Sequence, residues 1–388
     1  MGKNWAEHSN QYLQLFADCL AVKGAARSAF CDLTRHEIIT FPSEYHPVLE
    51  TLLGDRLGVV LNRIAVDPNR EAILRFLDFL DDNELVMLVD DKSAFPPISE
   101  EWDFPGEVQN AIIDVSGVLH DFQQIFRDLN SLGCQHVQIR CFSNLMTLAT
   151  SDPILEQAQH GSIVSIDLIL KYEEEMPDEA YVSFVEERPM IVAMTIHSAP
   201  RTRRVAVDYG LWEVRDSAPM REVRFTSREI GSAIHCGIIT QQYLCAPCVS
   251  TFFEAKAFNG CLNRKISIDV EGQIKNCPSM ARSYGQGRER SLPGALRSAG
   301  FKDLWDIAKD RIAVCCDCEF RYVCSDCRAY LEEPENVLSK PLKCGYDPYT
   351  ATWKQWSQDP RKARAVAFYG MEGLLRSEDD GAGRGGNG

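Results

Sequence analysis

Short alternating stretches of hydrophobic and polar residues open the chain, and a helical spacing follows them. Strands are predicted over residues 15–22, 28–33 and 37–41, with two helical segments after them. The second helix is expected to have Asp67 as its N-cap and Pro68 in its first turn. Its apolar stripe comprises Ile73, Leu74, Leu77 and Leu80, and a closing strand is expected over 85–91. Residues 1–92 are therefore predicted to form a small mixed module.

The chain then changes to a regular alternation of strands and helices. Paired prolines and acidic residues over 92–107 predict a domain boundary. Helices are expected along Phe122, Ile125, Phe126 and Leu129 and over 145–160, and strands over 111–115, 136–142, 162–172, 190–196 and 221–225. This alternation is typical of parallel βαβ units, so residues 105–235 are predicted to form a partial α/β barrel. The glycine-rich residues 376–388 are expected to be a disordered tail.

The composition of the chain indicates where the protein is located and which classes of partner it binds. The 388 residues include 56 acidic and 41 basic side chains, and the net charge of −15 repels phosphate backbones. The short cluster Arg201, Arg203 and Arg204 is interpreted as a solvated turn, so no nucleic-acid partner is expected. No apolar run approaches the roughly 20 residues that cross a bilayer, and the start lacks a secretory signal. We therefore expect a cytoplasmic protein with no membrane partner.

Cysteine is concentrated in the last third of the chain. Eleven of the 15 cysteines lie between Cys236 and Cys344. Because the cytosol keeps thiols reduced, this clustering favours metal ligands over disulfides. Short spacings such as Cys315 to Cys318 suit both four-thiolate zinc sites and iron–sulfur clusters, and spacing alone does not separate the two metals. The thiols expected to be core or incidental are Cys19, Cys31, Cys134, Cys141 and Cys316.

The segment between Cys261 and Cys277 has the pattern of a β-hairpin. Apolar residues alternate with polar neighbours from Ile266 to Val270, and Gly272 supplies the positive φ that the turn requires. Folding of this hairpin is expected to bring its two flanking cysteines together.

These features resemble a SPASM domain, the auxiliary-cluster extension of radical S-adenosylmethionine peptide maturases. The resemblance is carried by Cys261-x10-Gly272-x4-Cys277, Cys315-x2-Cys318-x5-Cys324, Cys327 and Cys344. The segments CLNRKISID, IKNCPSM and KDRIAVCCDCEFRYVCSDCRAY are similar to the SPASM-domain protein of grasp-with-spasm cassettes, which accompanies an ATP-grasp ligase and a short precursor peptide. The resemblance covers about residues 235–353, and more weakly the upstream part, so residues 236–356 are expected to be an iron–sulfur SPASM domain.

The resemblance implies ligands for two 4Fe-4S clusters. One cluster would be held by Cys315, Cys318, Cys324 and Cys344, and most of the other by Cys261, Cys277 and Cys327. The chain departs from the family at its last close pair, where only Ser325 and Asp326 stand in place of the usual three intervening residues. The eighth ligand stays open between Cys236 and the pair Cys245 and Cys248.

The chain lacks the CxxxCxxC loop that a radical S-adenosylmethionine enzyme needs, because no two cysteines are four residues apart. At the position of that loop the sequence is AIIDVSGVLHDF. We therefore expect a degenerate radical-SAM-like barrel for which S-adenosylmethionine is not a cofactor. The alternative is an active enzyme with an unconventional site built from Cys245, Cys248 and a third thiol.

The strands and helices of residues 1–92 resemble a winged-helix module called a RiPP recognition element, which captures a leader peptide as an added strand. A structural cap on the next domain is the other interpretation of this module. The resemblances imply maturation of a ribosomally synthesised peptide, with the precursor peptide and an ATP-grasp ligase as partners. They leave open whether the chain modifies the peptide itself or presents it to the ligase. A zinc-stabilised interaction scaffold is the alternative from another class.

Overall fold

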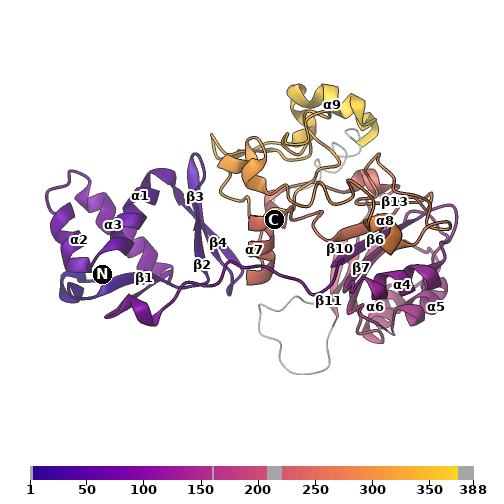
Figure 1. Ribbon diagram of the computed structural model, residues 1–388, viewed down its shortest axis with the longest axis horizontal. Coiled ribbons are helices and arrows are strands. Elements are labelled where there is room, and N and C mark those ends of the chain that lie inside the picture. Colours follow the sequence, from indigo (N-terminus) through magenta and orange to yellow (C-terminus); the bar gives the residue numbers. More distant parts are fainter. Residues whose placement is uncertain (1–2, 160, 208–220, 375–388) are drawn as a thin grey trace.

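The computed structural model describes residues 3–159, 161–207 and 221–374, so the expected tail at 376–388 lies outside the described residues. An N-terminal module lies at one end of the molecule and a large sheet at the other (Figure 1). The orange and yellow C-terminal segments lie alongside both (Figure 1). Within the described ranges, no helix has the length and apolar character needed to cross a bilayer.

The N-terminal module combines two small antiparallel sheets with three helices. Strand β1 (Tyr12–Leu15) pairs with β5 (Val86–Val89). The second sheet has the order β2-β3-β4, made of β2 (Cys19–Val22), β3 (Arg27–Asp32) and β4 (Glu37–Pro42). The helices are α1 (His46–Gly54), α2 (Leu57–Ile64) and α3 (Arg70–Asp82). Their apolar faces pack on Leu13, Phe30 and Phe41, where the rings of Phe30 and Phe41 stack 4.6 Å apart.

The structure has three helices where two were predicted. The stripe on α3 is confirmed, because Ile73, Leu77 and Leu80 are buried. The predicted start of this helix was wrong. Its first residue is Arg70, and the Asp67 carboxylate accepts a hydrogen bond of 2.7 Å from the Asn69 N–H, which forms a turn before the helix.

An eight-stranded sheet in the order β10-β11-β9-β8-β7-β6-β12-β13 is the largest element of the described chain. Its strands are β6 (Asn110–Val115), β7 (His136–Cys141), β8 (Ser165–Lys171), β9 (Ile191–His197), β10 (Arg203–Val207), β11 (Arg221–Phe225), β12 (Lys265–Ile268) and β13 (Ile274–Lys275). The strands from β11 to β12 are parallel, and β10 and β13 are antiparallel edges. The predicted mixed α/β class with a large parallel sheet is therefore confirmed.

The interpretation of the arginine cluster as a solvated turn was wrong at two positions. Arg203 and Arg204 lie in β10. The Arg203 guanidinium stacks 3.7 Å from the Phe225 ring centroid and forms an ion pair with Asp178. These contacts attach the antiparallel edge strand to the neighbouring strand and helix.

Helices α4 (Phe122–Ser131), α5 (Leu148–Ala158) and α6 (Asp178–Glu186) cover one face of this sheet (Figure 1). The predicted stripe of Phe122, Ile125, Phe126 and Leu129 is confirmed as buried. Asp121 is the N-cap of α4, where its carboxylate accepts a hydrogen bond of 3.0 Å from the Gln124 N–H. The remaining elements are α7 (Val249–Ala257), α8 (Leu292–Leu296), α9 (Ala363–Phe368), β14 (Tyr346–Asp347) and β15 (Thr352–Trp353).

The hairpin of the cysteine-rich region belongs to the main sheet. Strand β12 pairs in parallel with β6, and β13 closes the edge, so this sheet runs across the expected boundary at 235/236. Gly272 has φ +79° in the turn, as predicted, and a Cβ there would lie 2.9 Å from Gln286 Oε1. The alternation does not reach Val270, because β12 ends at Ile268 and Asp269 accepts hydrogen bonds from the turn N–H groups.

The N-terminal module packs directly on the cysteine-rich region. Ala25 N–H donates to Asp317 O at 2.8 Å, and Arg27 pairs with the buried Glu319 at 3.0 Å. At Gly24 a Cβ would lie 2.8 Å from Glu319 N, so only glycine permits this approach of the two backbones. The segment that follows Cys315 is therefore part of the contact with the N-terminal module.

A buried ion pair joins two neighbouring strands of the sheet, β6 and β7. Arg140 on β7 donates to both carboxylate oxygens of Asp114 on β6, at 2.6 and 2.8 Å. The two side chains are 5% and 1% exposed. Because the guanidinium has lost its water shell, it depends on this bidentate partner.

Replacing Asp114 by Ala is expected to lower the free energy of unfolding by about 3–5 kcal/mol, since the Arg140 charge stays buried without its carboxylate. The control is Asp55→Ala, which removes an ion pair with Arg63 whose side chains are about half exposed, at 50% and 56%. It should cost less than about 1 kcal/mol. Urea unfolding of the metal-free chain, followed by circular dichroism, measures both, and equal losses would contradict the buried pair.

Candidate metal centres

All 15 cysteines are free thiols, and eight of them gather in two groups. We call the first group site 1; it contains Cys315, Cys318, Cys324 and Cys344. We call the second group site 2; it contains Cys236, Cys261, Cys277 and Cys327. In the described part of the chain, no three His, Cys, Asp or Glu side chains are arranged as ligands of one metal ion.

The four sulfurs of site 1 line one cavity. Its walls also include Lys309 and the rings of Phe320, Tyr346 and Trp353. Burial raises the pKa of the Cys315 thiol to about 12, and the neighbouring Cys324 and Cys344 add to the rise while Lys309 opposes it. These four cysteines come from a loop and from a position 20 residues further along, as the resemblance implied.

The backbone adopts an unusual conformation directly before site 1. Cys315 begins a single 3-10 turn, Cys315–Asp317, and Val314 before it has φ +66°. A β-branched residue rarely adopts this left-handed conformation, so the surrounding contacts must hold it there. The Phe320 N–H donates to Cys318 Sγ at 3.4 Å, an arrangement that favours a charged sulfur.

The sulfurs of site 2 influence one another electrostatically. Burial raises the pKa of Cys277 to about 11, and Cys261 and then Cys236 add to the rise. Burial also raises the pKa of Cys327 to about 12, with Cys261 and Cys277 as further causes. A Cβ on Gly237, which has φ +80°, would lie 2.9 Å from Cys327 Sγ. Glycine at this position therefore allows the Cys236 backbone to approach Cys327.

The alternative ligands lie elsewhere. Cys245 and Cys248 are both exposed, and Cys248 Sγ contacts Thr251 Oγ1 at 3.4 Å at the start of α7. Cys236 is also exposed, but Lys343 holds its carbonyl oxygen with a hydrogen bond of 2.8 Å, beside Cys344. The structure therefore brings Cys236, and not the Cys245 and Cys248 pair, to the other three sulfurs.

Each site has one lysine that donates to a sulfur. Lys309 Nζ lies 3.2 Å from Cys324 Sγ in site 1, and Lys265 Nζ lies 3.5 Å from Cys261 Sγ in site 2. Burial opposes protonation of Lys265, yet Cys261, Cys277 and Cys236 raise its pKa. Both ammonium groups are therefore positioned to balance negative charge on sulfur.

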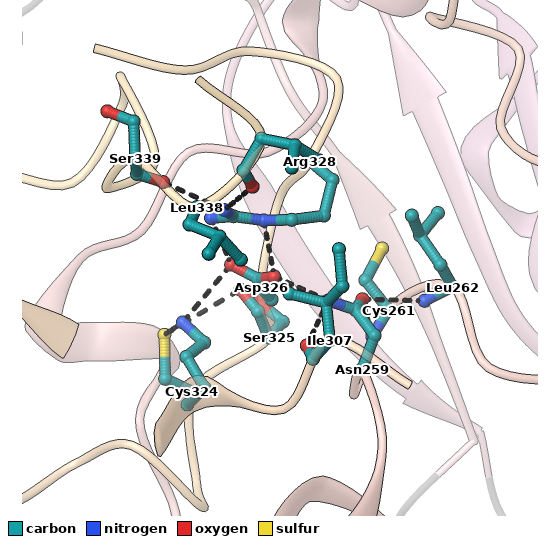
Figure 2. A network of polar contacts seen from close by, with 12 residues as sticks. Asn259, Cys261, Leu262, Ile307, Cys324, Ser325, Asp326, Arg328, Leu338 and Ser339 are labelled. Carbon is teal, nitrogen blue, oxygen red and sulfur yellow. Dashed lines mark hydrogen bonds and ion pairs between the residues drawn. The ribbon is translucent and has the colours of Figure 1, made fainter. Parts of the chain in front are cut away.

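A carboxylate lies between the two sites. Figure 2 shows Asp326 with Cys324 on one side and the backbone of Cys261 on the other. Its side chain is 0% exposed, and its oxygens accept hydrogen bonds from Asn259 Nδ2 at 2.6 Å and from Arg328 at 2.8 Å. Lys309 lies 3.4 Å away. Burial opposes ionisation, but Lys309 and Arg328 lower the pKa of Asp326.

Asn259 connects this carboxylate to site 2. Its side-chain oxygen accepts hydrogen bonds from the N–H groups of Cys261 and Leu262, at 3.1 and 3.0 Å. The same amide donates to Ile307 O at 3.0 Å and to Asp326 (Figure 2). The positions of Cys324 and Cys261 are thus fixed by one continuous polar network.

A polar cavity of about 340 Å³ adjoins site 2. Cys261 and Lys265 line it together with the first residues of β6, β7 and β8. Among its polar groups, Asp167 accepts a hydrogen bond of 2.6 Å from Gln138. The volume lies in the range of small-ligand pockets.

Four polar residues of these sites were not predicted from the sequence: Lys265, Lys309, Asn259 and Asp326. A role for Asp326 was predictable from the sequence. Its carboxylate lies between two cysteines that were expected to be buried, and a buried carboxylate requires a buried cation nearby. The contact between Lys309 and Cys324 was not predictable, because the two residues are 15 positions apart in the sequence. Of the thiols expected to be core or incidental, Cys19, Cys31, Cys134 and Cys141 are buried, and Cys316 is half-buried.

Comparison with known proteins found structural similarity to five solved chains. No protein-family profile and no curated protein matches the chain. Among solved structures, the crystal structure of Streptococcus suis SuiB bound to S-adenosylmethionine has 10% sequence identity and a TM-score of 0.29. The alignment covers 85% of this chain and 98% of that chain. A similarity this low does not establish a shared fold.

Alkylation should distinguish the placements of these thiols. At pH 8 the metal-free folded chain is expected to react with iodoacetamide at the exposed Cys245 and Cys248. Cys31 and Cys134 should react only after denaturation, because burial raises the pKa of each to about 12 and leaves almost no thiolate. Peptide mass spectrometry measures each rate. Labelling of Cys31 as fast as Cys248 in the folded chain would contradict the structure.

Proposed function

We propose that this chain is an iron–sulfur protein for the maturation of a ribosomally synthesised peptide. In this proposal sites 1 and 2 each hold a 4Fe-4S cluster, the N-terminal module binds the precursor peptide, and the chain acts with an ATP-grasp ligase. The observation that carries the proposal is the grouping of eight cysteines into two sites, each with a lysine on a sulfur.

The residues of both sites fit such a cluster. Four thiolates are the usual ligand set, and soft sulfur donors favour iron–sulfur clusters or zinc. Isolated thiolates in these positions would be costly, as the raised pKa values of Cys315 and Cys327 indicate. A bound cluster would supply one-electron transfer. The chain itself holds the sulfurs in place, excludes water with the rings around site 1, and balances charge through Lys265 and Lys309.

The N-terminal module supports a role in peptide binding. A three-stranded antiparallel sheet whose edge strands are β2 and β4 can accept an extended peptide as a further strand. The sheet is also packed against the segment that follows Cys315, through Arg27 and Glu319. A peptide bound there would be held next to the cysteine-rich region, either for modification or for presentation to the ligase.

The ligase partnership and the precursor rest on the sequence resemblance alone. The chain lacks a CxxxCxxC loop, and for this reason the proposal assigns no role to S-adenosylmethionine. The cavity beside site 2 is where a side chain of the bound peptide would reach Cys261.

Metal analysis of the anaerobically purified chain tests the clusters. We expect about eight iron and about eight sulfide per chain, with visible cluster absorption. Cys344→Ala should remove the site 1 cluster and Cys236→Ala the site 2 cluster, so each variant should retain about half the iron. The matched control is Cys248→Ala, which removes an exposed cysteine outside both sites and should retain all of it.

Three results would contradict the clusters or their assigned ligands. About two zinc atoms per chain without visible absorption would favour the zinc-stabilised scaffold. Full iron content in Cys236→Ala, together with iron loss in Cys248→Ala, would move site 2 to the other candidate ligands. Iron bound equally well by all three variants would show adventitious binding.

Hydrogen exchange tests precursor binding and its location. Adding the precursor peptide should slow amide exchange in β2 or β4, the edges of the N-terminal sheet, because an added strand accepts and donates backbone hydrogen bonds. Exchange in β10, the edge of the main sheet, is the internal control. Mass spectrometry of the exchanged peptides gives the readout. Unchanged exchange over residues 19–42 at saturating peptide would contradict the proposed role of this module.

A further inference from the structure

Each candidate metal centre has a lysine beside one of its sulfurs. The ammonium group of each lysine lies within hydrogen-bond distance of one sulfur atom of its own site. Lys309 is 4% exposed and belongs to a short 3-10 turn, Lys309–Arg311. Lys265 is the first residue of β12. Neither lysine is among the proposed cluster ligands, which are all cysteines.

The surrounding contacts fix both lysines. Asp326 accepts from Asn259 and Arg328 and lies 3.4 Å from Lys309, so the ammonium is held against Cys324. The backbone of Lys265 is held by the parallel pairing of β12 with β6, where Lys265 lies opposite Asn110. The Lys309 charge is therefore already in place when the charge of the centre changes. Lys265 is half-buried beside the polar cavity, where its backbone pairing and its contact with Cys261 Sγ position it.

An ammonium group beside a cluster sulfur stabilises the reduced cluster more than the oxidised cluster, because the reduced cluster carries more negative charge. Each added electron places more negative charge on the sulfurs, and an N–H donor at a sulfur stabilises that charge. Hydrogen bonds to ligand sulfurs and local charge are among the factors that set the reduction potential of an iron–sulfur cluster. A lysine at 3.2 Å in a water-poor site therefore favours the reduced state.

We propose that Lys309 and Lys265 are paired tuning residues, Lys309 for site 1 through Cys324 and Lys265 for site 2 through Cys261. Each raises the one-electron reduction potential of its own centre. This inference rests on the proposed function, because it requires iron–sulfur clusters in both sites. The reduction step transfers one electron from an external low-potential reductant of the dithionite class to the centre, with no bond formed or broken.

The experiment is a redox titration of the anaerobic full-length protein, followed by electron paramagnetic resonance. Lys309→Met removes the donor and the charge but keeps most of the apolar volume. At a fixed applied potential, the ratio of reduced to oxidised site 1 cluster should fall about tenfold, which is about 59 mV for one electron. The potential of site 2 should stay unchanged. Lys265→Met should give the reverse pattern.

Three further variants provide assignment and controls. Cys344→Ala should retain only the electron paramagnetic resonance signal of the site 2 cluster. This variant therefore shows which of the two measured potentials belongs to which site. Lys309→Arg keeps the charge and a donor, and should restore most of the lost potential. The matched control is Lys302→Met, an exposed lysine 5.2 Å from the Trp305 ring in the same loop, which should leave both potentials unchanged. If Lys309→Met does not assemble, Lys309→Gln replaces it and should give a smaller fall in the same centre.

The outcomes separate this inference from the proposed function. Iron in both sites with unchanged potentials in the Met and Gln variants overturns the tuning role and leaves the clusters in place. Equal shifts in both centres from one substitution overturn the pairing of each lysine with its own site. An iron-free protein overturns the proposed function and this inference with it.

Discussion

The buried carboxylate of Asp326 is the constraint on which the cysteine-rich half depends. A fully buried charge is costly unless cations and hydrogen-bond donors surround it, and here Arg328, Lys309 and Asn259 do so. Those partners fix Lys309 at Cys324 and Asn259 at the backbone of Cys261. One interaction therefore sets the positions of sulfurs in both candidate centres, although they belong to distant parts of the chain.

The same geometry gives a reason for the shortened spacing between Cys324 and Cys327. These two cysteines belong to different sites, and the two residues between them include the carboxylate of the polar network. The chain therefore passes from one centre to the other within the four residues from Cys324 to Cys327, with Asp326 between them. A second connection runs beside it, where Ile239 forms a parallel bridge with Cys344 and Lys343 holds the carbonyl of Cys236.

Much of the regular structure was predictable from the sequence, because periodicity reports which side chains a sheet or helix buries. The stripe on α4 and the strands β6, β7, β8, β9 and β11 followed from that pattern. The edge strand β10 did not, since its Arg203 is stabilised by Phe225 and Asp178, which only the folded chain brings near. The extra helix break at Asp55 and the true start of α3 depend on local turn chemistry that spacing does not reveal.

The candidate site divides in the same way. The spacing and the SPASM resemblance singled out seven of the grouped cysteines, whereas the grouping of Cys236 with them is visible only in the fold, where Gly237 approaches Cys327. The roles of the two lysines and of Asn259 could not be predicted. Lys309 and Asn259 contact residues that are distant in the sequence, and Lys265 belongs to no recognisable motif. Anomalous diffraction at the iron absorption edge, from crystals grown without oxygen, tests the central claim most directly. The account predicts two separate groups of iron density, one bonded to Cys344 and one bonded to Cys236, and density at the zinc edge alone, or none at these cysteines, would contradict it.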